Sequence, residues 1–251
     1  MTTTRAASVD KIDVIELRHY LLHPGQRDTL IALFDREFLE SQEETGMHVI
    51  AQFRDIDRPD VFTWLRGFPG MTARAASLAA FYDGPVWQKH KHAANATMID
   101  SDDVRLLRPV RPRAGFALDE ARPARDATAI PPGLIVATIY TLSSEAAAGF
   151  PALFEQAIAP RMIASEATPF ATFETEESAN TFTRLPVREG EHAFVWFARF
   201  ADVAAYDRHV SALASDPSWS NEVQPMLEHQ LSARTEIWRL TPTSRSRSLS
   251  V

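Results

Sequence analysis

The residues of this sequence best suited to chemistry lie on two short segments. In ELRHY, Glu16, Arg18 and Tyr20 alternate along a predicted strand, so their side chains share one face of it. In FTWLRGF, Arg66 follows Trp64 at the same spacing and shares its face. An arginine beside aromatic rings and a tyrosine hydroxyl can hold an anionic or carbonyl-bearing small molecule.

The same residues also allow a purely structural interpretation. A buried arginine needs a partner, which Glu16 or the aromatic rings would supply. The sequence leaves two alternatives open: a ligand pocket anchored by its arginines, or a salt bridge with Tyr20 as packing. In the first alternative, Arg18 is a candidate catalytic residue, and the candidate substrate-binding residues are Glu16, Tyr20, Trp64 and Arg66.

One histidine could supply proton transfer to such a pocket. His48 and Gln52 share one parity of a predicted strand, MHVIAQFR, at residues 47–54. Histidine changes charge near neutral pH and is the usual general base. If this parity faces the pocket, His48 is the candidate catalytic base and Gln52 contacts the substrate. If it does not, His48 is a surface histidine.

No motif for a covalent nucleophile, a metal or a cofactor occurs. The sequence has no cysteine, which excludes disulfides, thiolate ligands and cysteine nucleophiles. His90 and His92 stand two positions apart, so a helix would place them on different sides. A lone helical histidine such as His209 is a weak indication of haem, and neither a P-loop nor a G-x-S-x-G segment is present. We therefore expect no metal and no cofactor.

Composition narrows the classes of partner. The formal net charge of −7 and the pI near 5.6 disfavour nucleic-acid binding, which needs a basic face. No apolar run reaches the roughly 18–20 residues that span a bilayer, and the first residues contain no secretory segment. We expect a small-molecule ligand, no nucleic acid, no membrane and a cytoplasmic location.

The aromatic residues reveal an internal repeat. Five residues recur at one constant offset: Phe62, Trp64, Phe68, Pro85 and Trp87 correspond to Phe194, Trp196, Phe200, Pro217 and Trp219. Upstream the offset is shorter, so the second copy contains about twelve additional residues, which we place in 175–191. This pattern indicates a tandem duplication.

Each copy predicts the same elements. Strands at 13–22, 47–54, 61–68 and 104–109 alternate with helical regions at 27–44 and 72–96, which is the β-α-β-β-α-β order of a ferredoxin-like unit. The proline-rich stretch 110–133 supports neither a helix nor a ladder. We therefore predict repeats at 13–109 and 134–242, a linker at 110–133, and disordered ends at 1–12 and 243–251.

The predicted fold is an α+β barrel formed within one chain. Helices cover one face of each antiparallel sheet, and an aromatic strand cannot leave the other face in water. We expect the two sheets to pack face to face, with Phe62, Trp64 and their copies across the interior. Glu16, Arg18 and Arg66 would then point into the barrel, and Phe62 and Trp196 join the candidate binding residues.

A family resemblance supports this fold. The segment VIELRHYLLHPGQ at 14–26, the W-x-R strand, and R-x2-S-L-A-A-F-Y-D-G-P-V-W at 74–87 resemble the NIPSNAP family. The resemblance implies the dimeric α+β barrel fold over 13–109 and, in part, over 134–242. It implies no single reaction, because relatives in this superfamily include cofactor-independent monooxygenases, isomerases and haem enzymes.

The two copies differ in their charged residues. Glu16 aligns with Val136, Arg18 with Thr138 and Arg66 with Ala198. We therefore expect one asymmetric pocket, lined mainly by the first copy, for a small aromatic, carbonyl-bearing or anionic molecule. The protein would act on it as a cofactor-independent monooxygenase or isomerase. The alternative is a non-catalytic binding or scaffold protein; a homodimer of the whole chain is compatible with either.

Overall fold

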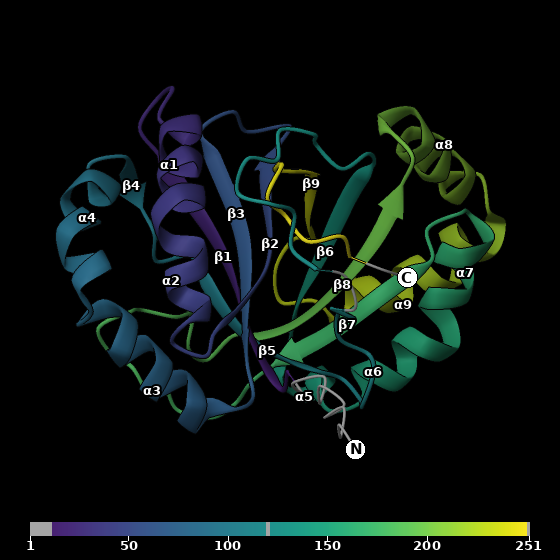
Figure 1. The fold of residues 1–251 in the computed structure, drawn as a ribbon. Coiled ribbons are helices and arrows are strands. Elements are labelled where there is room, and N and C mark those ends of the chain that lie inside the picture. Colours follow the sequence, from purple (N-terminus) through teal and green to yellow (C-terminus); the bar gives the residue numbers. More distant parts are fainter. Residues whose placement is uncertain (1–11, 119–120, 250–251) are drawn as a thin grey trace, which may run out of the picture.

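The computed structural model describes residues 12–118 and 121–249. Two ferredoxin-like units follow each other along the chain (Figure 1). The first contains β1 (Val14–Leu22), α1 (Arg27–Leu33), the π-helical turn η1 (Phe34–Phe38), α2 (Leu39–Glu43), β2 (His48–Asp55), β3 (Val61–Phe68), α3 (Met71–Tyr82), α4 (Pro85–Asn95), β4 (Met98–Asp100) and β5 (Val104–Pro109).

The second unit repeats this order. It contains β6 (Leu134–Leu142), α5 (Ser144–Ala147), α6 (Phe150–Leu153), the π-helical turn η2 (Phe154–Ile158), α7 (Ala159–Ala164), β7 (Pro169–Thr175), β8 (His192–Phe200), α8 (Val203–Ala214), the π-helical turn η3 (Trp219–Val223), α9 (Gln224–Gln230) and β9 (Glu236–Pro242). The predicted strands of the first unit match the observed ones to within one residue at each end.

The strands close into one barrel. Within the described residues the hydrogen-bonded order is β3-β2-β9-β6-β8-β7-β5-β1, and β1 pairs again with β3, while β4 adds to the side of β1. Two seams join the units: β2 with β9 at Phe53–Pro242, and β5 with β7 at Leu107–Thr175. Helices α1 to α4 cover one flank of the barrel and α5 to α9 the other (Figure 1). The predicted intrachain α+β barrel is confirmed.

Local sequence explains where the first helical region stops. Gly46 has a φ of +88°, in the left-handed region that a residue with a Cβ rarely adopts. Its amide bonds to the carbonyl of Glu43, the last residue of α2. Glycine therefore ends this helix and turns the chain into β2.

The prediction of which strand face lines the barrel was wrong. The interior is filled by the aliphatic parity and a few rings, including Ile15, Leu17, Leu65, Phe197 and Trp238. The aromatic parity points outward, where Phe62, Trp64 and Phe68 pack beneath the helices of their own unit. The lumen of an eight-stranded barrel is only wide enough for its side chains, so small and branched residues suit it. Glu16, Arg18 and Arg66 therefore lie between sheet and helices, outside the barrel.

The C-terminal segment is packed rather than free. Arg245 pairs with Glu40 at 2.5 Å and Arg247 with Glu43 at 3.1 Å, while Leu249 reaches the barrel core. The prediction of a disordered tail is thus wrong for residues 243–249; residues 1–11 and 250–251 lie outside the described part.

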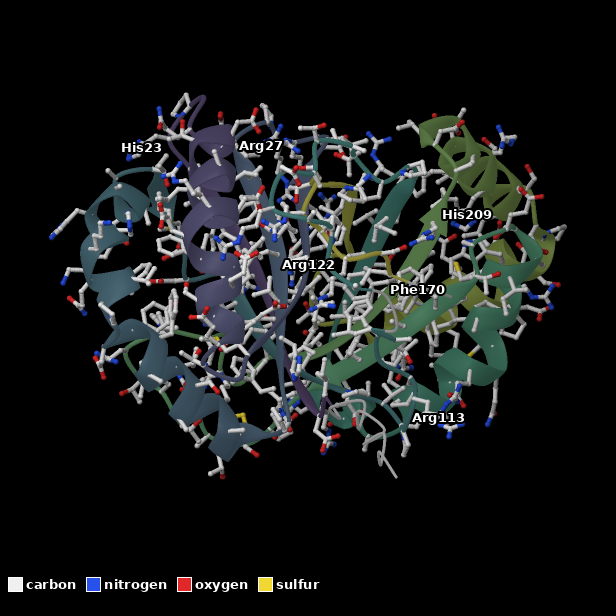
Figure 2. All side chains as sticks on the ribbon, viewed as in Figure 1. His23, Arg27, Arg113, Arg122, Phe170 and His209 are labelled. Atoms are coloured by element: carbon white, nitrogen blue, oxygen red, sulfur yellow. The ribbon has the colours of Figure 1, made fainter. Side chains whose placement is uncertain are left out.

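The proline-rich stretch between the units also packs against the barrel. Phe116 lies 5.0 Å, ring to ring, from both Phe173 and Phe197. Arg122 pairs with Glu43 at 2.6 Å, and Figure 2 shows it midway between the helices of the two units.

Among the described residues, no helix is both long and apolar enough to span a bilayer.

We predict that Leu249→Ala lowers the free energy of unfolding by about 2–3 kcal/mol, because the leucine is 2% exposed and the change opens a cavity in the barrel core. Leu21→Ala is the matched control, since Leu21 is 44% exposed. Urea unfolding measures both. Equal, negligible effects would mean that the tail does not pack.

Candidate functional site

A single buried carboxylate organises the helix-covered face of the first unit. Glu16 on β1 is fully buried and pairs with three arginines: Arg18 at 2.5 Å, Arg66 at 2.7 Å and Arg74 at 2.7 Å. Arg18 is a neighbour on β1, Arg66 stands opposite Glu16 on β3, and Arg74 comes from α3. Strand register and helix packing therefore bring these charges together.

This cluster contains a surplus of positive charge. Its other hydrogen-bond partners are neutral: the Gln42 side-chain oxygen accepts from Arg66 at 3.1 Å, and the Asn180 side-chain oxygen accepts from Arg74 at 2.9 Å. Burial alone raises the pKa of Glu16, but the charges of Arg66, Arg18 and Arg74 outweigh it and hold that pKa far below the usual range. One carboxylate thus faces three guanidinium groups.

Arg18 is the member of this cluster that lines a cavity. Its Nε donates to the Tyr20 hydroxyl oxygen at 2.6 Å, and both residues line a cavity of about 370 Å³. Burial raises the pKa of Tyr20, although the charge of Arg18 opposes this, so the hydroxyl keeps its proton. Because the tyrosine oxygen already accepts from Arg18, its own O–H remains able to donate to a ligand.

The cavity lies between β1, α4 and a loop from the second unit. Its wall combines aromatic and cationic side chains: Arg18, Tyr20, Tyr82, Trp87, Gln88, Lys91, Asn95, Met98, Ser101, Phe182, Arg184 and Leu185. None of these twelve carries a carboxylate. Its chemistry therefore suits a ligand with negative charge and aromatic surface.

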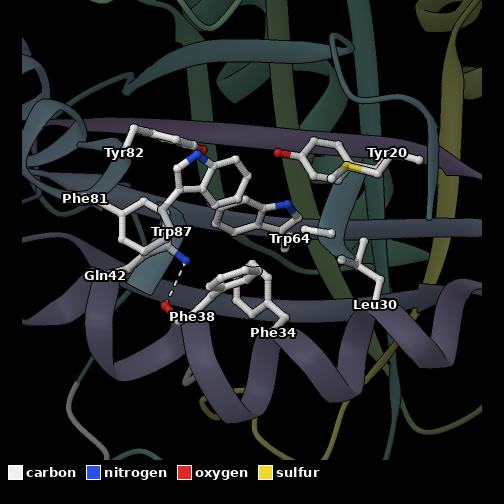
Figure 3. Close-up of a pocket in the computed structure, with 11 residues that line it drawn as sticks. Tyr20, Leu30, Phe34, Phe38, Gln42, Trp64, Phe81, Tyr82 and Trp87 are labelled. Carbon is white, nitrogen blue, oxygen red and sulfur yellow. Dashed lines mark hydrogen bonds between the residues drawn. The ribbon is translucent and has the colours of Figure 1, made fainter. Parts of the chain in front are cut away.

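An apolar chamber of about 40 Å³ adjoins this cavity (Figure 3). The two share Tyr20, Tyr82, Trp87 and Met98. Figure 3 shows the rings of Trp64, Phe34 and Phe38 on the side towards α1 and α2. The chamber is completed by Leu30, Gln42, Phe81 and Ala94. The chamber therefore adds an apolar, aromatic wall next to Tyr20.

A π-helical turn supplies two of these rings. η1 places Phe34 4.8 Å from Trp64 and Phe38 5.6 Å from Trp87, measured between ring centroids. An extra residue in a helical turn shifts its side chains relative to a regular helix, and such turns are frequent at functional sites. The indole Nε1 of Trp64 has no hydrogen-bond partner among the described residues, so it is a further free donor.

The structure brings together most of the predicted site residues. Glu16, Arg18, Tyr20, Trp64 and Arg66 form one cluster, in which the Arg66 guanidinium lies 5.1 Å from the Trp64 ring centroid. Only Arg18, Tyr20 and Trp64 of these five line the cavities. Phe62 packs behind them against Phe34 at 5.7 Å. The candidate site therefore lies outside the barrel, on the face opposite to the predicted one.

Three predicted residues lie elsewhere. In the strand register, His48 lies opposite Gly67, and Gly67 also lies opposite Ile15. His48 therefore shares the face of Ile15, and its side chain points to the barrel side of the sheet. Gln52 faces the helices, but its side chain donates to Asp35 at 3.1 Å beneath the C-terminal segment. Trp196 packs in the second unit. The structure does not bring His48 to the cavity, so the prediction of His48 as its general base has no geometric support.

Sequence reasoning missed Arg74, Tyr82, Lys91 and Arg184. A signal for Arg74 was present, because it shares the stripe of Leu78 and Phe81 on α3, and a charge in an apolar helical stripe requires a buried partner. Tyr82 lies inside the family-like segment 74–87 and Lys91 follows it, but neither carries a distinctive spacing. Arg184 comes from the second unit, and no pattern in the sequence connects it to the first.

The corresponding place in the second unit is uncharged. Val136, Thr138 and Ala198 replace the three charged residues, while Tyr140 and Trp196 remain as the counterparts of Tyr20 and Trp64. Burial raises the pKa of Tyr140 to about 12. The predicted asymmetry of charge between the units is therefore present in the structure.

The described part of the chain contains no group of side chains placed to bind a metal ion. No group of three or more histidine, aspartate or glutamate side chains is arranged to hold an ion there. His19 stacks on Trp238 inside the barrel at 4.0 Å, and burial together with nearby arginines lowers its pKa to about 3.

One known protein family matches the first unit. Residues 15–112 match the NIPSNAP family. The resemblance seen in the sequence is thereby confirmed over this NIPSNAP-like unit, which contains the whole Glu16 cluster. No curated protein matches the chain.

Solved structures show that the two-unit barrel is shared. A presumed monooxygenase from Lactobacillus acidophilus is 13% identical, with a TM-score of 0.54, over 96% of this chain and 100% of that one. A presumed monooxygenase from Fusobacterium nucleatum is 8% identical, with a TM-score of 0.56, over 96% of each chain. An anthrone oxidase-like protein is 10% identical, with a TM-score of 0.57, over 96% of this chain and 98% of that one. At these identities the similarity establishes the fold.

We predict that Glu16→Gln destabilises the protein by about 3–5 kcal/mol at neutral pH, because three buried arginines lose their counter-charge. The pKa of Glu16 is lower in the folded state than its ordinary value of 4.5. This stabilisation is therefore complete above that value and is lost as pH falls through the folded-state pKa.

Urea unfolding at pH 7 and pH 3 measures the free energy of unfolding of the wild type and of Glu16→Gln. We expect the difference between these two free energies to be smaller at pH 3 than at pH 7. Glu37→Gln is the control, since Glu37 pairs with Arg36 at the surface. A pH-independent difference for Glu16→Gln would contradict the assigned ionisation.

Proposed function

We propose that this protein binds a small aromatic molecule with an ionisable hydroxyl or carbonyl oxygen in the cavity of its first unit. The observation that carries the proposal is the Arg18–Tyr20 pair, buried at a cavity wall beside a chamber of aromatic rings. The cavity volume falls in the range usual for small-molecule sites.

Hydrogen-bond chemistry supports an anionic oxygen at this pair. The free donors at the wall are the guanidinium of Arg18, the hydroxyl of Tyr20 and the indole N–H of Trp64. Arginine cannot accept a hydrogen bond, so it favours the deprotonated oxygen of an enol or phenol. The surplus charge of the Glu16 cluster adds to this preference, because water is largely excluded there.

We further propose that the bound anion is oxidised by O2 without a cofactor. Structural neighbours include presumed monooxygenases and an anthrone oxidase-like protein, and this likeness in fold motivates the choice of reaction. An aromatic enolate is electron-rich enough to reduce O2 itself. In this scheme, Arg18 and Tyr20 hold the enolate oxygen, and the proton released on ionisation passes to water at the cavity mouth.

For an anthrone-type substrate the reaction balances with O2 alone. The CH2 carbon between the two aryl rings loses two hydrogens and gains one oxygen atom as a carbonyl. The second oxygen atom leaves with those two hydrogens as water. The carbon is oxidised and O2 is reduced, so neither a metal nor an external reductant is required.

A non-catalytic binding protein is the second candidate. Glu16, Arg66 and Arg74 are fully buried and do not line the cavities, which is the arrangement expected of a structural cluster. Such a protein would bind the same ligands and leave them unchanged. Binding and turnover therefore need separate measurements.

We predict that 2-naphthol binds and quenches tryptophan fluorescence, because Trp64 and Trp87 line the apolar chamber. Arg18→Gln should weaken binding by about 10- to 100-fold, since a charged hydrogen bond is lost, and Tyr20→Phe by about 2- to 10-fold. Arg36→Gln, at an exposed position, is the control. The ether 2-methoxynaphthalene, which cannot ionise, should bind wild type weakly. Equal affinity of all variants for 2-naphthol would rule out this site.

We predict that the protein consumes one O2 per anthrone converted to anthraquinone, with no added metal or flavin. An oxygen electrode and product absorbance measure the stoichiometry. Arg18→Gln should reduce the rate by about 10- to 100-fold, while Arg36→Gln should not change it. Ligand binding with no oxygen uptake above the uncatalysed rate would favour the non-catalytic function.

A further inference from the structure

A loop of the second unit completes the cavity of the first. Residues 176–191, between β7 and β8, contain the region where the sequence placed the additional residues of the second copy. In Figure 1 this green loop leaves the second unit and runs beside α3. The unit that lacks the charged cluster therefore contributes side chains to the unit that has it.

Hydrogen bonds fix this loop to the first unit. The Asn180 side-chain oxygen accepts from Arg74 at 2.9 Å and from the Phe182 amide at 3.0 Å. Its side-chain nitrogen donates to the Leu185 carbonyl at 2.9 Å. Thr181 donates to the Met71 carbonyl at 3.2 Å. The buried charge cluster and the loop are thus joined through one asparagine.

The loop presents an aromatic ring and a cation to the cavity. Phe182 packs on Tyr82, with 5.9 Å between ring centroids, and the Arg184 guanidinium lies 4.7 Å from the centroid of the Phe182 ring. Arg184 also pairs with Asp83 at 2.8 Å. Across the cavity, α4 supplies Lys91.

The cations of the cavity lie at two depths. Arg18 is 1% exposed at its inner wall, whereas the Arg184 side chain is 54% exposed. Lys91, bonded to Gln88 at 2.6 Å, shares the outer part with Arg184. A ligand with a single acidic oxygen would satisfy the inner position and leave the outer one unused.

We infer that the natural ligand carries a carboxylate at the end remote from its ionisable hydroxyl or carbonyl oxygen, and that residues 176–191 are the segment that recognises it. The inference rests on the proposed function, because it assumes that the aromatic body occupies the cavity. Arg184 and Lys91 hold the carboxylate near the surface, and Phe182 covers the aromatic body. Arg184 is a specificity-determining residue supplied by the second unit.

Two probes test the inference. Calorimetry compares 2-naphthol with 6-hydroxy-2-naphthoate, which adds a carboxylate to the opposite end of the same ring system. We expect the carboxylate probe to bind wild type about 5- to 30-fold more tightly. Arg184→Gln and Lys91→Gln should each remove most of this difference, because each loses much more affinity for the carboxylate probe than for 2-naphthol.

Asp83→Asn is the matched control, because it removes the same surface ion pair and keeps the arginine. It should preserve or increase the preference for the carboxylate probe. Equal binding of the two probes to wild type would overturn the inference while leaving the proposed function standing. The inference would also be overturned if Asp83→Asn lost the preference for the carboxylate probe as fully as Arg184→Gln does. Binding of neither probe would refute the proposed function itself.

Discussion

The structure depends on one carboxylate shared by three arginines. Glu16 joins β1 to β3 through Arg66 and to α3 through Arg74, and it fixes Arg18 beside Tyr20. A buried guanidinium without a counter-charge is unfavourable, so the position of each arginine is tightly constrained. Arg74 extends the constraint to the second unit through Asn180. The same cluster therefore determines both the charge and the shape of the cavity.

Barrel closure and the Glu16 cluster use different layers of this fold. The lumen and the two seams unite the units with apolar side chains and backbone hydrogen bonds, so no polar site is needed inside. The layer between sheet and helices contains the large rings of Phe34, Phe38 and Trp64. The second unit has aromatic rings but no charges at the corresponding positions, and it supplies both the barrel partner and the covering loop.

Sequence patterns predicted the fold well because each rested on local physics. Strand alternation, helical periodicity and the recurring aromatic residues predicted the elements, their order and the closed barrel. The choice of inner and outer face failed, since alternation of Ile15 and Leu17 with Arg18 shows that two faces differ but not which one the helices cover. For the site, the cluster of Glu16, Arg18 and Arg66 was predictable from parity; Arg184 was not, because its approach depends on the path of a long loop.

The ligand site that we propose lies beneath the helices of the first unit and not inside the barrel. A crystal structure of the full chain with 6-hydroxy-2-naphthoate tests it directly. We expect the naphthalene ring against Trp64 and Trp87, the hydroxyl oxygen within hydrogen-bond distance of Arg18 and Tyr20, and the carboxylate near Arg184. Ligand density within the barrel lumen, or beneath the helices of the second unit, would contradict the account.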